Sequence, residues 1–234
     1  MTVPEDRRRL AIAGSIATIV AIALGVVMLA LAMRAYPGGT ALDRTTVGHA
    51  FWWNFLCDLT GDNAVNGVAN PRGSALARGA MAAFAAAFGC FSMIVPLSFA
   101  NGRAFDGPIR TLGLLAVLGV LLVPATTGRG HIVVVLASAG AGLAASTLAL
   151  IGSVRWSQSR LLAALACAAV AAGLADAVLY AQSHLVHPRV VPPALPFFQR
   201  LALILLVAWM VAVAVRVLMT PARASERDHL VQRR

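Results

Sequence analysis

The sequence predicts an all-α membrane protein, a single domain over residues 1–234 built as a polytopic bundle of six transmembrane helices. Hydrophobic residues make up 59% of the chain and charged residues only 12%, about half the charge fraction of a typical soluble domain. Six apolar runs are long enough to cross hydrocarbon, since a helix rising 1.5 Å per residue needs about 20 residues to do so. The few polar residues that interrupt these runs gather toward one end of the predicted bundle.

The six predicted spans cover residues 10–33, 76–99, 111–127, 131–153, 160–182 and 198–219. Arginines at 7–9 precede the first span, as in a secretory signal peptide. The apolar core of a signal peptide is only ~7–15 residues long, however, and this run is longer. We therefore expect the first span to remain as an uncleaved helix.

Arginine distribution predicts the orientation of the bundle. The net charge is +10, and all 19 basic residues are arginine. With the amino terminus in the cytoplasm, twelve arginines fall on the inner side and six on the outer side, in agreement with the positive-inside rule. The sequence therefore predicts a multi-pass protein of the inner (cytoplasmic) membrane with both termini cytoplasmic. This role for the charge also argues against nucleic acid as a partner and favours membrane lipid.

The first outer connection, residues 34–75, is far longer than an ordinary loop, and long loops are often functional. It contains an aromatic run from His49 to Asp58 that includes Trp52 and Trp53. Aromatic rings favour the membrane–water interface, so this run predicts a short interfacial helix. We interpret the loop as a polar lid over the outer end of the bundle.

Asp176 is the most informative residue within a span. A carboxylate in hydrocarbon is costly and needs a partner or a purpose. Tyr180 and His184 follow it at four-residue steps and share its helix face. Gln199 and Arg200 open the next span from the same outer side, which makes Arg200 the expected counter-charge for Asp176. The alternative is a buried ion pair that only fixes helix packing.

Further polar residues could approach the same outer vestibule. His131 opens the fourth span, and Asn54 and Asp58 lie four residues apart in the loop. His131, His184 and His187 together with the carboxylates suggest a zinc site, but no HExxH-type spacing is present, so the sequence predicts no metal and no cofactor. Nor do the three cysteines, 57, 90 and 167, form a disulfide or zinc pattern. The predicted catalytic residues are Asp176 and His131, and the predicted substrate-binding residues are Asn54, Asp58, Tyr180, Gln199 and Arg200.

The loop and these later residues resemble a known group of proteins. The run FWWNFLCDL at residues 51–59, with Asn66-Gly67 and Asn70-Pro71 after it, is similar to the first outer loop of a family of uncharacterised six-helix bacterial integral membrane proteins, of the domain-of-unknown-function type. The resemblance extends to His131, Asp176, Tyr180 and the Gln199-Arg200 pair, which in that family is usually Gln plus a basic residue. It implies the same six-helix fold. The layout is also similar to eukaryotic six-helix proteins of the autophagy-modulator and GPI-remodelling kind, but no catalytic residue can be carried over from either group.

The sequence leaves three functions open. The first is a lipid-binding or lipid-modifying protein with a polar pocket in the outer half of the bundle, which the convergence of Asp58, His131, Asp176, Tyr180 and Arg200 favours. The second is a non-catalytic scaffold or a partner of a larger membrane complex, suggested by small residues in rows such as Gly79, Ala83 and Ala87. The third is a small proton-coupled transporter with Asp176 as the titrating group. The sequence does not decide between a homo-oligomer and a protein partner.

Overall fold

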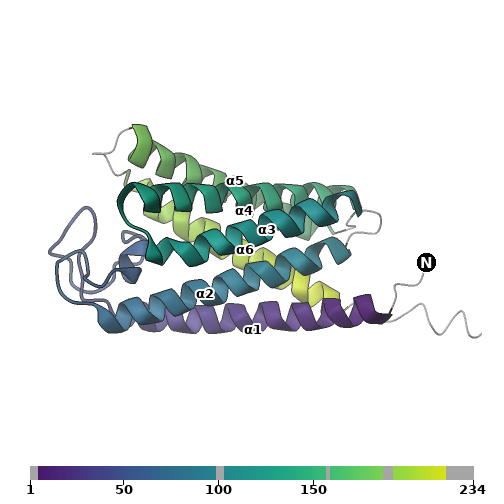
Figure 1. The fold of residues 1–234 in the computed structure, drawn as a ribbon, viewed down its shortest axis with the longest axis horizontal. Helices are drawn as coiled ribbons and strands as arrows, with labels where there is room; N and C mark the ends of the chain where they lie inside the picture. The colour runs from purple at the N-terminus through teal and green to yellow at the C-terminus, as the bar shows by residue number, and fades with distance from the viewer. Residues whose placement is uncertain (1–4, 99–102, 157–158, 187–191, 220–234) are drawn as a thin grey trace, which may run out of the picture.

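A computed structural model describes residues 5–98, 103–156, 159–186 and 192–219, and it contains six long apolar helices (Figure 1). They are α1 (Glu5–Ala35), α2 (Pro71–Ile94), α3 (Arg103–Leu122), α4 (Gly128–Trp156), α5 (Arg160–Ala181) and α6 (Ala194–Met219). Each of the six is long and apolar enough to cross a membrane. The predicted all-α six-helix fold is therefore confirmed, and the chain is a multi-pass membrane protein.

Several helices begin earlier than the hydrophobic runs suggest, and proline accounts for two of these differences. Pro71 is the first residue of α2, and Pro196 lies in the first turn of α6. The amide groups of a first helical turn have no partner within the helix, so proline costs nothing there. The third helix also starts at Arg103 rather than near 111 and continues through Pro108.

The helices run roughly side by side along the long axis of the molecule (Figure 1). Helices that follow each other in sequence pack together, and α1 also packs against α6, so the bundle closes on itself. Its core contains Phe91 of α2 and Trp209 of α6, whose rings meet edge to face at 4.9 Å. Large apolar side chains such as Leu118, Val133 and Leu174 are exposed on the outside of the bundle, as a lipid-solvated surface requires.

The connection between α1 and α2, residues 36–70, covers one end of the bundle, which we call the loop end (Figure 1). Isolated antiparallel bridges join Gly38 to Val47 and Asn63 to Ala69. Gly39 has a φ of 86°, and a Cβ atom there would collide with the backbone of Asn66, so this turn requires glycine. The aromatic run that was predicted as a short helix forms turns, and only a 3-10 turn, η1 (Cys57–Thr60), follows at its end.

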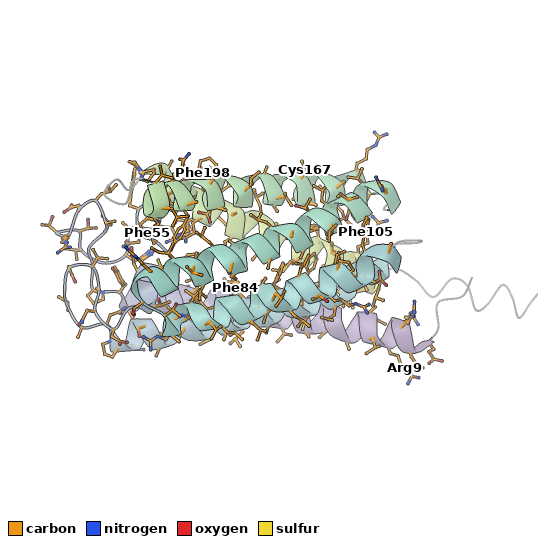
Figure 2. The ribbon with its side chains drawn as sticks, turned by 45° about the horizontal axis from the view of Figure 1, so that its top comes forward. Arg9, Phe55, Phe84, Phe105, Cys167 and Phe198 are labelled. Carbon is orange, nitrogen blue, oxygen red and sulfur yellow. The ribbon has the colours of Figure 1, made fainter. Side chains whose placement is uncertain are left out.

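Two further short elements lie at the loop end. Helix α3 continues into the 3-10 turn η3 (Val123–Ala125), and α5 continues into the π-helical turn η4 (Gln182–Val186). Figure 2 shows Phe55 beside this end of the bundle, with Phe105 and Arg9 toward the opposite end. The polar residues singled out in the sequence thus lie near the end that the long loop covers.

Candidate functional site

Arg200 is the centre of the polar network at the loop end. Its side chain is only 1% exposed, although it carries a charge. Its Nε donates to the Phe51 carbonyl at 3.0 Å, and its Nη2 donates to the Asn54 carbonyl at 2.8 Å. The guanidinium also lies over the Phe51 ring, with its carbon 5.4 Å from the ring centroid. Arg200 therefore anchors the loop by binding its backbone.

Two amide side chains extend this anchorage. The Gln199 Oε1 accepts from the Leu56 backbone N–H at 2.7 Å and from Arg200 Nη1 at 3.4 Å. Within the loop, the fully buried Asn54 donates through Nδ2 to the Gly39 carbonyl at 2.7 Å and to Asp58 Oδ2 at 3.1 Å. The loop segment 49–58 is thus held both to α6 and to its own first turn.

Titratable groups inside this network have shifted pKa values. The pKa of His49 is lowered to about 4, mainly by burial and also by the positive charge of Arg200. Burial raises the pKa of the Cys57 thiol to about 12. Burial likewise raises the pKa of Asp58, against the effect of its hydrogen bonds from Asn54 and the Phe55 N–H. Neutral imidazole suits the geometry, since His49 Nε2 lies 3.4 Å from Arg200 Nη2 and can accept from it.

The expected ion pair between Asp176 and Arg200 is not present. Arg200 uses its donors on the loop backbone, whereas Asp176 Oδ1 is buried and has no hydrogen-bond partner among the described residues. The prediction was wrong because it matched opposite charges and did not consider carbonyl oxygens, which also accept from a guanidinium. Arg200 is therefore part of the loop anchor rather than a free site for an anionic group.

Asp176 instead lines a cavity of about 280 Å³ between helices α2 to α6. Along α5 it is the lining residue nearest the loop end, and Gln199 is the first lining residue of α6. Most of the wall is apolar, formed by side chains such as Phe84 and Leu206. Ser138 and Ser146 also line it, and their eight-residue separation corresponds to about 12 Å along α4. The cavity is therefore elongated, with a carboxyl and an amide at its loop-end wall.

The remaining predicted site residues lie outside this cavity. His131 Nδ1 is 3.2 Å from the Val123 carbonyl, so His131 packs against η3. Tyr180 is buried against Phe55 and Leu195, and its ring stacks on His184 at 4.0 Å. Asn54 and Asp58 are hydrogen-bonded to each other, but they lie inside the loop and not at the cavity. Because His131 and Asp176 do not share a pocket, the structure provides no acid–base pair built from these two residues.

No set of three histidine, cysteine or acidic side chains within the described ranges is placed to hold a metal ion. His187, which was considered as a possible zinc ligand, lies outside those ranges. The sequence analysis missed His49 as a contact of Arg200 and Ser138 and Ser146 as cavity residues. A row of small residues at 138, 142 and 146 was the available signal, since a face of small side chains can leave space as well as bring helices together.

Comparisons with family models, curated proteins and solved structures find no match to this chain. The resemblance to the bacterial six-helix family therefore stays a prediction that rests on its short motifs.

Proposed function

We propose that this protein binds a membrane lipid, or a similar amphiphile, in the cavity that helices α2 to α6 surround. The observation that carries the proposal is the buried Asp176 Oδ1, which has no hydrogen-bond partner within the described ranges and lies in the wall of an otherwise mainly apolar cavity. A buried polar atom without a partner costs about 1–3 kcal/mol, and a ligand that supplies the partner removes this cost. An elongated apolar space with one polar end matches the shape of an amphiphile.

The proposal is for binding rather than chemistry, because His131 contacts η3 and Arg200 is occupied by the loop. We further propose that the protein lies in a bacterial cytoplasmic membrane with the loop end facing outward. The arginine distribution supports this orientation. In this orientation, the polar end of the cavity lies in the outer half of the bilayer.

Two glycines of α4 provide a matched test. Gly142 lines the cavity, and a Cβ atom at this position would be 3.6 Å from the Ala116 Cβ, an ordinary contact. Gly140 is exposed on the outside of the same helix, with no atom within 4 Å of a Cβ. We expect Gly142→Phe to fill the cavity and Gly140→Phe to leave it open.

The measurement is the amount of lipid that co-purifies with each variant, determined by native mass spectrometry. We expect the wild type and Gly140→Phe to retain bound lipid and Gly142→Phe to lose most of it while still folding. Equal lipid content in all three proteins would refute the proposal.

A further inference from the structure

We propose that the ligand is a single-chain amphiphile whose polar end is an amine, and that the Asp176 carboxylate recognises this amine. This inference rests on the proposed function and specifies its ligand class. It excludes amphiphiles with an anionic head group.

The charges in the cavity wall support a cationic head group. Among the described residues that line the cavity, Asp176 is the one with an ionisable side chain. Its Oδ1 is buried and accepts no hydrogen bond within the described part of the chain. A carboxylate can stay ionised in a low-dielectric site when a cation lies beside it, and an ammonium group supplies both the charge and the hydrogen bonds. The described part of the chain places no such cation at the cavity wall, so the ligand is the natural source.

The same wall gives an anionic head group no counter-charge. The nearest arginine in sequence to the cavity, Arg200, already donates to the Phe51 and Asn54 carbonyls. Gln199 can donate from its amide Nε2, since only its Oε1 is occupied, by the Leu56 N–H, but a neutral amide carries no charge to balance an anion. A phosphate or carboxylate would therefore lie beside the Asp176 carboxyl without a positive partner, which disfavours it.

Hydrogen-bond roles along the wall favour a donor at the ligand's polar end. Ser138 Oγ donates to the Ala116 carbonyl at 2.9 Å, so its remaining capacity toward the cavity is that of an acceptor. Asp176 is likewise an acceptor when ionised. A primary ammonium group, with three donors, complements these oxygens better than a carbonyl or an ether does.

The cavity volume indicates how much of an apolar chain fits between the helices. A dry protein cavity of about 150 Å³ holds benzene, which is about 25 Å³ per non-hydrogen atom. At this ratio the 280 Å³ cavity accommodates about 11 non-hydrogen atoms. One unbranched chain of about ten carbons with a small head group fits within this volume.

Three radiolabelled probes with the same chain test the inference: decylamine, decanol and decanoic acid. Binding is measured by scintillation proximity to protein in zwitterionic nanodiscs, with empty nanodiscs correcting for partitioning. Charge-assisted hydrogen bonds exceed neutral ones by about 1–1.5 kcal/mol, so we expect decylamine to bind about tenfold more tightly than decanol. Decanoic acid should bind more weakly than either.

Asp176→Asn keeps the shape of the side chain and removes its charge. We expect the preference for decylamine to disappear in this variant while decanol binding stays, which also shows that the cavity is intact. Equal binding of the three probes by the wild type, or an amine preference that survives Asp176→Asn, would overturn the inference and leave the proposed function standing. If none of the probes binds the wild type better than it binds Gly142→Phe, both the proposed function and the inference fail.

Discussion

Arg200 shows how a buried charge can be stabilised without an opposite charge. Its guanidinium is satisfied by two backbone carbonyls of the loop, one aromatic face and a neutral imidazole. Peptide carbonyls carry partial negative charge, and a planar donor group with five N–H bonds can reach several of them at once. A lysine has no such planar fork, so arginine is the residue suited to this position.

Removing this side chain should release the loop. We expect Arg200→Gln to lower the free energy of unfolding by about 3 kcal/mol, because it removes charge-assisted hydrogen bonds and leaves the Phe51 and Asn54 carbonyls without their partner. The Cys57 thiol, whose pKa is raised to about 12 by burial, should then be alkylated faster. Thermal unfolding and the rate of maleimide labelling measure the two effects. Arg129→Gln, at an exposed arginine of the same end, is the control, and an equal effect of both substitutions would contradict this role.

His49 should make the attachment of the loop sensitive to acid. Its pKa in the folded protein is about 4, below the ordinary value of 6.5, so a detached loop binds a proton at higher pH than the attached loop. The contribution of neutral His49 to the free energy of loop attachment is therefore fully present above about pH 6.5 and is lost as the pH falls toward 4. Protonation also places a second positive charge beside Arg200.

Hydrogen exchange of the segment 49–58, corrected for intrinsic rates, measures this effect. We expect the opening constant to rise between pH 6.5 and 4, by at most about tenfold per pH unit for one proton. His49→Phe should remove most of this dependence. An opening constant that is independent of pH in the wild type would show that His49 does not control the attachment.

At the level of the helices, close approach depends on a few small residues. Gly119 of α3 faces Ser138 of α4, and a Cβ atom on Gly119 would lie 2.5 Å from the Ser138 Cβ. The Ser138 hydroxyl meanwhile donates to the Ala116 carbonyl, which joins the two helices directly. Small side chains let helix backbones approach closely, which is a main source of helix association in lipid.

We therefore expect Gly119→Ala to destabilise the protein by about 1–2 kcal/mol, although alanine is the better helix former. The clash with Ser138 outweighs the gain in helix propensity. Gly140→Ala, where a Cβ atom meets nothing within 4 Å, should be neutral or slightly stabilising. Unfolding midpoints of the two variants in the same detergent test this contrast, and similar midpoints would show that α3 and α4 are not closely packed here.

Helices were largely predictable from the sequence, and their contacts were not. Six apolar runs correctly predicted six helices because the hydrocarbon thickness sets the length of a span. Helix starts were less predictable, since Pro71 and Pro196 looked like loop residues but occupy first turns. The site depends on pairs far apart in sequence, such as Arg200 and Asn54, which are 146 residues apart. Spacing along one helix says nothing about such pairs.

For the whole molecule, the proposed orientation places the loop end outside the cell. In a background without native cysteines, we expect Val47→Cys in the loop to react with an impermeant maleimide in intact cells. Arg8→Cys, near the start of α1 at the opposite end, should react only after permeabilisation. Both positions are exposed, so accessibility in the protein itself does not limit either reaction. The reverse pattern would place the loop and the polar end of the cavity in the cytoplasm.

Gln199 has two roles that cannot be adjusted separately. Its side chain belongs to the wall of the cavity and also accepts the Leu56 N–H of the loop. A substitution of Gln199 that adapts the cavity wall to a different ligand therefore also removes a hydrogen bond that holds the loop to α6. Diversification of binding preference in proteins built on this plan should consequently proceed through Gly142 and Ser146 of α4, which lie away from the hydrogen bonds between α6 and the loop.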